Sequence, residues 1–112
     1  MVSSDVAFRG EVWGCAFPQP LGPHPALILT ANRIAAPLSA VTVALITGTS
    51  GPESTHVRIG PESGVTRYDE SFVNCSDIHT VAKPRLRRRL GLVAPSELRR
   101  VEETIQLVLG LK

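Results

Sequence analysis

Only one stretch of this 112-residue sequence has the period of an amphipathic helix, and it lies at the C-terminal end. Pro95 to Leu109 begins with a proline, which suits a first helical position, and Glu97 falls in the first turn, where a negative charge favours the helix dipole. The apolar residues share one face: Leu98, Val101, Ile105, Val108 and Leu109. Gly110 ends the pattern. We therefore predict one terminal helix that packs on a sheet.

The chain before this helix consists of short apolar runs separated by segments rich in proline and glycine, which is typical of strands and turns. The expected strands are Glu11 to Phe17, Ala26 to Ala31, Val41 to Ile46, His56 to Ile59, Ser71 to Cys75, Ile78 to Val81, and a short last strand ending at Leu92. The fifth and sixth are either separate or one strand bent at Ser76-Asp77. This order predicts a mainly β (α+β) fold, a small strongly bent sheet or barrel in one domain spanning residues 1–112.

The charges nearly balance, with 12 Lys and Arg against 10 Asp and Glu, so the overall field would attract nucleic acid only weakly. One segment is densely basic, and we expect it in a turn before the last strand: Lys83, Arg85, Arg87, Arg88 and Arg89. This cluster is either a surface for RNA phosphates or an acidic partner segment, or a solvated turn.

Several classes of protein are disfavoured. Cys15 and Cys75 lie in apolar runs and are expected to be reduced, buried thiols. The histidines and cysteines lack the spacing of metal ligands, so we expect no metal and no cofactor. No apolar run approaches the roughly 20 residues that a membrane helix needs. We expect a cytoplasmic protein without membrane contact.

The segment between the first two strands contains Pro18, Pro20, Pro23 and Pro25, and we expect it to be an irregular loop. A loop between two strands can present a polar side chain, and here that side chain is His24. Because imidazole exchanges a proton near neutral pH, His24 is the first candidate for acid–base chemistry.

A set of segments resembles the MazF/PemK toxins of bacterial toxin–antitoxin pairs, in order and spacing, from Arg9 to Leu111. The segments are Arg9-Gly10-Glu11-Val12-Trp13, the run from Gly22 to Leu29, Leu45-Ile46-Thr47, Thr55-His56-Val57, and Asp77 to Val81 before Arg89-Leu90-Gly91. The resemblance implies an SH3-like barrel with a C-terminal helix, as in MazF and CcdB, and a homodimer. It further implies an endoribonuclease that cuts single-stranded RNA at a short sequence, without ribosome or metal, and a cognate MazE-like antitoxin that occupies the RNA groove. Such cleavage inhibits translation and growth, and the target is messenger RNA, with ribosomal and transfer RNA left open.

The family's catalytic pair is an arginine before the proline of the second strand and a threonine at the end of the third. By position these are His24, a departure from the family, and Thr47. The reaction is attack of the ribose 2′-hydroxyl on the adjacent phosphate, which leaves a 2′,3′-cyclic phosphate and a 5′-hydroxyl. It needs a base, an acid and donors for the phosphate charge. We hypothesise that His24 is the acid or base and that Thr47 binds the phosphate or orients the 2′-hydroxyl. The alternatives are a histidine kept for turn geometry and a threonine that bonds a turn amide.

A group of residues is expected to face RNA: Phe17, Gln19, Thr49, Ser50, Arg58, Ser76, Asp77 and His79. The last three lie at the bend that faces the RNA groove in this family, and the other five are candidates from their own position and chemistry. Phe17 would stack on an unpaired base, and Gln19 and Asp77 would read base edges. The alternatives are a core position for Phe17, a solvated side chain for Arg58 and an Asx turn for Asp77. Two other functions stay open: a CcdB-like poison that binds gyrase, and a degenerate relative that binds RNA or antitoxin without cutting.

Overall fold

The computed structural model describes residues 7–112, so residues 1–6 of the predicted domain lie outside it. Its strands are β1 (Glu11–Ala16), β2 (Pro23–Ile28), β3 (Ala40–Thr47), β4 (His56–Ile59), β5 (Ser71–Ala82) and β6 (Leu86–Leu92). Its helices are α1 (Asn32–Ala35) and α2 (Pro95–Val108), with short 3₁₀ turns at Pro61–Ser63 and Lys83–Arg85. The predicted terminal helix and the mainly β composition are confirmed.

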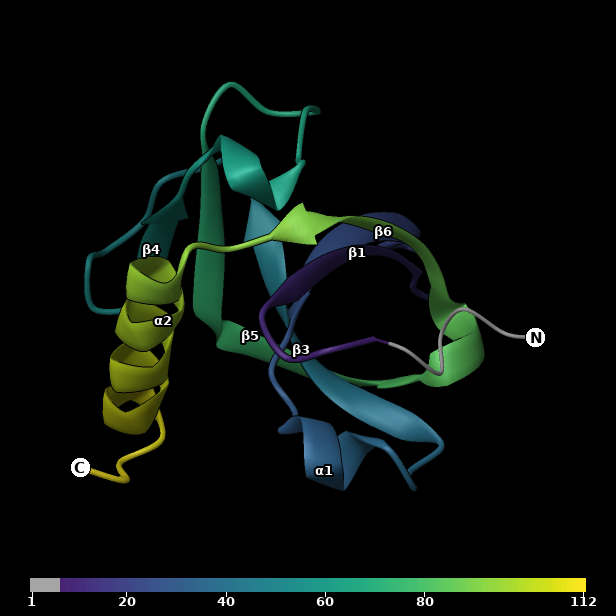
Figure 1. Ribbon diagram of the computed structural model, residues 1–112. Coiled ribbons are helices and arrows are strands. Elements are labelled where there is room, and N and C mark those ends of the chain that lie inside the picture. The colour runs from purple at the N-terminus through teal and green to yellow at the C-terminus, as the bar shows by residue number, and fades with distance from the viewer. Residues whose placement is uncertain (1–6) are drawn as a thin grey trace.

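The strands form one six-stranded antiparallel sheet in the order β4-β5-β3-β2-β1-β6. The sheet curls strongly, and α2 stands beside β4 and β5 (Figure 1). Within residues 7–112 the two edge strands, β4 and β6, do not pair with each other, so the barrel is open. This agrees with the expected small bent sheet closed by a C-terminal helix.

The sheet has an apolar core on each face. The helix-side core includes Leu27, Ile46, Val73 and Val101 and is covered by α2. The core on the other face, which we call the distal core, consists of Ala7, Trp13, Cys15, Phe17, Ala26, Ile28, Ala35, Val41, Val43, Leu45, Val81 and Leu86. Residues alternate between the two cores along each strand, as the pleat requires. Which core a strand residue faces can therefore be read from its neighbours.

Strand β5 is one bent strand, which decides between the two alternatives for residues 71–81. Ala44 of β3 pairs with Ile78, whereas Ile46 pairs with Val73. Two steps along β3 thus correspond to five along β5, and the extra residues form a bulge. At this bulge Asn74 Oδ1 accepts hydrogen bonds from the Ser76 amide at 3.1 Å and the Ser76 hydroxyl at 2.6 Å. The bulge re-aims the strand just before Asp77.

The second strand begins earlier than expected, so placing His24 in a loop was wrong. Strand β2 covers Pro23 to Ile28, and His24 pairs with Cys15 of β1. The prolines are tolerated because the paired residues of β2 and β3 start only at Ala26, and a strand that is bonded on one side needs fewer amide hydrogens. The sequence shows the prolines but not which side of the strand is free.

The basic cluster lies differently from the prediction of a turn. Arg87, Arg88 and Arg89 belong to strand β6, because pairing with β1 overrides their weak strand propensity. Lys83 is 8% exposed, and its Nζ donates to the carbonyl oxygen of Ala35 at 2.8 Å. It stabilises the end of α1 and is not part of an exposed patch.

Leu109 also departs from the expected apolar face, because it follows the helix end and is 55% exposed.

Cys15 and Cys75 are free and buried, as predicted. Burial raises the pKa of Cys15 to about 12 and that of Cys75 to about 11, so both stay protonated at neutral pH. Within residues 7–112 neither helix has the length and hydropathy needed to cross a membrane.

Candidate functional site

The structure brings the two predicted catalytic residues together across neighbouring strands. The pairing of β2 and β3 ends at Ala26 and Leu45, and His24 and Thr47 lie two residues beyond it on their strands. Because side chains alternate along a strand, both lie on the same face of the sheet as Ala26 and Leu45. That face is the distal one, because Ala26 and Leu45 belong to the distal core. The two residues predicted from their sequence positions therefore lie on the same face of the sheet.

The imidazole of His24 is held in one orientation. Its Nε2 lies 2.8 Å from the carbonyl oxygen of Ile46. A carbonyl oxygen can only accept, so Nε2 carries the hydrogen and the lone pair of the neutral ring is on Nδ1. Burial lowers the pKa of His24, and the positive charges of Arg67 and His79 add to this, while the Ile46 bond and the Asp77 carboxylate oppose it. At neutral pH the ring is therefore uncharged and can accept a proton at Nδ1.

Thr47 ends β3 and has the local role that the simpler alternative predicted. Its Oγ1 accepts a hydrogen bond from the Thr49 amide at 3.2 Å. The hydroxyl hydrogen is not used by that bond, since the oxygen acts as the acceptor. Thr47 can thus shape the turn and still donate to a phosphate oxygen.

A second histidine lies on the same face of the sheet. His79 Nε2 is 2.7 Å from Asp77 Oδ1, and both side chains are partly exposed, at 37% and 43%. The ring of His79 also meets the edge of Phe17, with centroids 5.4 Å apart. Phe17 itself is a distal-core residue with 7% exposure, which leaves little of its ring for stacking on a base. The bend in β5 thus puts a second histidine, oriented by Asp77, on the same face as His24 and against Phe17.

Arg67 is a cation near His24 that sequence reasoning missed. It belongs to the segment between the 3₁₀ turn at Pro61–Ser63 and β5, and its Nη1 donates to the carbonyl oxygen of Pro23 at 3.2 Å. Its guanidinium also lies 5.4 Å from the ring centre of Tyr68. Arg67 and His24 line one pocket of about 200 Å³. No periodicity marks a residue of this loop, so only the folded chain reveals it.

The register also reveals Phe72, a half-buried residue of β5 that pairs with Thr47 on one side and with Arg58 on the other. Arg58 therefore shares the face of Thr47, two strands away. It forms an ion pair with Glu70 at 3.1 Å in which its side chain is 66% exposed. This is the solvated arrangement that the alternative predicted.

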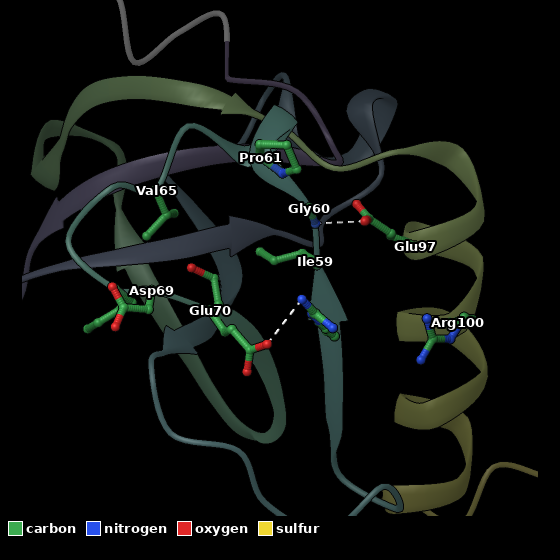
Figure 2. A pocket seen from close by; sticks show the side chains of 11 residues that line it. Ile59, Gly60, Pro61, Val65, Asp69, Glu70, Glu97 and Arg100 are labelled. Carbon is green, nitrogen blue, oxygen red and sulfur yellow. Dashed lines mark hydrogen bonds and ion pairs between the residues drawn. The ribbon is translucent and has the colours of Figure 1, made fainter.

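Arg58 and Glu70 border a separate pocket of about 450 Å³ between β4 and the start of α2. Figure 2 shows this pocket, with Gly60 donating its amide hydrogen to Glu97 at 2.7 Å. The bond ties β4 to the first turn of α2. This pocket therefore lies where the helix is attached to the sheet. No histidine of the candidate site lines it.

The other predicted RNA contacts lie on exposed turns near the pair. Thr49 and Ser50 follow Thr47 and Gly48 in the turn after β3, and Gln19 lies in the short turn between β1 and β2. In that turn the Phe17 amide bonds to the Gly22 carbonyl oxygen at 3.2 Å. Ser76 is exposed at the β5 bulge. Together these turns and His24, Thr47, Asp77 and His79 form what we call the two-histidine site.

The comparisons with known proteins address the whole chain. The family model for the PemK-like, MazF-like toxin of type II toxin–antitoxin systems matches residues 8–109. The chain belongs to this family. A curated Mycobacterium tuberculosis protein named "Probable endoribonuclease MazF2" is 32% identical over 91% of this chain and 97% of its own length. The Mycobacterium bovis protein named "Endoribonuclease MazF1" is 30% identical over 92% of each.

Solved structures agree with this family. An endoribonuclease from a mycobacterial species, solved in complex with its cognate antitoxin, is 28% identical. It superposes with a TM-score of 0.84 over 96% of this chain and 98% of its own. MazF from Deinococcus radiodurans, at 20% identity and a TM-score of 0.76 over 94% of this chain and 97% of its own, shows the same fold. The expected MazF/PemK recognition is confirmed, and endoribonucleases among the relatives favour the nuclease over the gyrase-binding alternative.

Proposed function

We propose that this MazF-like toxin is a metal-independent endoribonuclease that cuts single-stranded RNA at the two-histidine site. The observation that carries the proposal is that His24 and Thr47 lie on one face at adjacent ends of β2 and β3, with His24 Nε2 bonded to the Ile46 carbonyl oxygen at 2.8 Å. This arrangement leaves Nδ1 as the acceptor for the 2′-hydroxyl proton. The 2′-oxygen then attacks phosphorus, and the products are a 2′,3′-cyclic phosphate and a 5′-hydroxyl.

The family arginine would stabilise the phosphate charge, and histidine in its neutral form cannot. We assign that role to Arg67, which lines a pocket with His24 and carries a guanidinium that stays charged at all working pH. The Thr47 hydroxyl adds a hydrogen-bond donor. The chain would thus divide the work of one arginine between a titratable base and a separate cation.

The biological setting follows from the same proposal. The chain is one toxin domain that acts on messenger RNA in the cytoplasm, where reduced Cys15 and Cys75 are expected. It inhibits translation and growth until a cognate antitoxin binds, and it works as a homodimer. Support comes from relatives solved with their antitoxins and named as endoribonucleases.

The test is cleavage of a long unstructured RNA by the purified protein in excess chelator, with the ends mapped. We expect cuts at one recurring short sequence, with cyclic phosphate and 5′-hydroxyl ends. His24→Ala should lower the rate by roughly 10²–10⁴-fold, the usual contribution of a general base. His56→Ala, which changes a histidine of β4 outside the site, should leave the rate unchanged.

The pH dependence separates His24 from a structural histidine. The wild-type rate should decrease as the pH is lowered through the pKa of His24, because only the neutral ring accepts a proton. Since that pKa is lowered from 6.5, the decrease should occur below pH 6.5. This acid limb should be absent in His24→Ala. Arg67→Ala should reduce the rate and move the acid limb to higher pH, because the Arg67 charge helps to lower the pKa of His24. Arg99→Ala, at an exposed position of α2, is its control. Absence of cutting by the wild-type protein would contradict the proposal and favour a chain that only binds its partners.

A further inference from the structure

The reaction described above requires a proton donor for the leaving 5′-oxygen, and neither Thr47 nor Arg67 is suited to that task. A threonine hydroxyl is too weak an acid, and a guanidinium does not give up its proton at any working pH. The donor must lie on the same face of the sheet as His24 and be within a few ångströms of the phosphate. Only a group with an exchangeable proton near neutrality meets this requirement.

His79 lies on that face, and its ring packs against Phe17, two residues beyond the Cys15 that pairs with His24. Its strand, β5, bulges before Asp77, and the next residues on the distal face are Asp77, His79 and the distal-core residue Val81. Both Asp77 and His79 are close enough to His24 for their charges to affect its pKa. The ring of His79 is partly exposed, so a substrate can reach it.

The contacts of His79 fix which nitrogen would act. The Asp77 carboxylate can only accept, so the 2.7 Å bond to Nε2 holds a hydrogen on that nitrogen. This bond also orients the ring. The edge of Phe17 packs against the ring, with centroids 5.4 Å apart, and limits its rotation. The proton available for transfer is therefore the one on Nδ1.

We propose that His79 is the general acid of the reaction and that Asp77 is its positioning residue, opposite His24 as the general base. His24 Nδ1 takes the 2′-hydroxyl proton while the 2′-oxygen bonds to phosphorus. The bond from phosphorus to the 5′-oxygen breaks, and that oxygen takes the proton from His79 Nδ1. His24 ends as imidazolium and His79 as neutral imidazole, and exchange with water restores both. This inference rests on the proposed nuclease function and names a catalytic residue for it.

The two rings have partners of different kinds. Burial, Arg67 and the second histidine oppose the protonation of His24 and lower its pKa. His79 instead has the Asp77 carboxylate as its partner. The step needs one group that accepts a proton and one that donates a proton, and these partners suit the two roles.

The decisive experiment replaces the leaving oxygen by sulfur. An RNA oligonucleotide that carries the mapped cleavage sequence is made with a 5′-bridging phosphorothiolate at the scissile linkage. A thiolate leaves without a proton, so the general acid is no longer needed. We expect His79→Ala to lose roughly 10²–10⁴-fold on the oxygen substrate and to recover most of that loss on the sulfur substrate. His24→Ala should be slow on both.

Further variants separate catalysis from structure. Because His79 packs on Phe17, His79→Gln is made beside His79→Ala to keep the ring site filled. Asp77→Asn should show a smaller loss with the same rescue by sulfur. Thr80→Ala, an exposed residue of the same strand outside the site, is the control and should match the wild type on both substrates.

The outcomes are distinct for the two proposals. Equal losses on both substrates in the His79 variants, or no loss on either, would overturn the assignment of His79 while the nuclease proposal stood. A wild-type chain that cuts neither substrate would overturn the nuclease proposal and this inference with it. Rescue by sulfur restricted to the His79 and Asp77 variants would establish the general acid.

Discussion

Glu11 is a buried carboxylate whose removal should cost this protein much of its stability. Its side chain is 11% exposed and accepts three hydrogen bonds, from the Phe8 amide at 2.8 Å, from Trp13 Nε1 at 3.1 Å and from Arg89 Nε at 2.7 Å. It thereby joins β1, the segment before it and the edge strand β6. We expect Glu11→Ala to loosen the closure of the sheet at this edge.

The size of the effect follows from what each donor can do afterwards. Trp13 is 2% exposed, so its indole N–H would be left without an acceptor, at roughly 1–3 kcal/mol. Phe8 and Arg89 are about half exposed and can turn to water, so each loses only about 0.5 kcal/mol. The sum is about 3 kcal/mol, which corresponds to a fall in melting temperature of about 12 °C for a domain of this size.

Glu11→Gln separates the charge from the hydrogen bonds. Its Oε1 still accepts from Phe8 and Trp13, while its amide opposes Arg89, so we expect a loss of about 1 kcal/mol at pH 7. Burial raises the pKa of Glu11, but the bonds from Phe8, Arg89 and Trp13 outweigh it, and the net pKa is lowered from 4.5. The wild-type advantage over Gln is therefore fully present above pH 4.5 and is lost as the pH falls through the lowered pKa.

The assay is urea unfolding at one fixed protein concentration, at neutral and acidic pH, with the exposed helix residue Glu103→Ala as control. The control should change the free energy of unfolding by less than about 0.5 kcal/mol. A loss below about 1 kcal/mol for Glu11→Ala would refute the reasoning about the indole N–H. A gap between wild type and Gln that is the same at both pH values would refute the reasoning about charge.

Three further predictions test the packing. Gly64→Ala should destabilise the fold by more than about 3 kcal/mol, because φ is +75° and a Cβ would lie 2.0 Å from the Leu90 carbonyl oxygen. Gly110→Ala, with φ +71° and open space around it, should cost only about 1–2 kcal/mol, and equal losses in thermal unfolding would contradict this contrast. Val101→Ala, at 0% exposure under α2, should cost about 2 kcal/mol in urea unfolding, whereas the exposed Leu107→Ala should be nearly neutral. Cys15 and Cys75 should react with a thiol reagent only as fast as the protein opens, since both are buried and their pKa values are raised to about 12 and about 11; rapid labelling of the native chain would contradict their burial.

Local sequence patterns determined most of the elements. The 3.6-residue period of Pro95 to Val108 and the β-branched run of β3 specify a helix and a strand through short-range packing alone. The candidate pair His24 and Thr47 came from resemblance to a family by position, and the register of β2 and β3 brings these residues together. Such features can be predicted from the sequence because they depend on neighbours within a few residues or on aligned motifs.

Other features exist only in the folded chain. Pro23 and Pro25 can belong to β2 because β3 does not pair with β2 at these residues. The bulge in β5 is defined by the register of β5 with β3. Arg67 reaches Pro23, and His79 packs against Phe17, through contacts between residues more than forty positions apart. Local propensity carries no information about which distant strands pair. The sequence by itself therefore determined the elements and one candidate pair, while the tertiary structure decided which cation and which second histidine stand beside it.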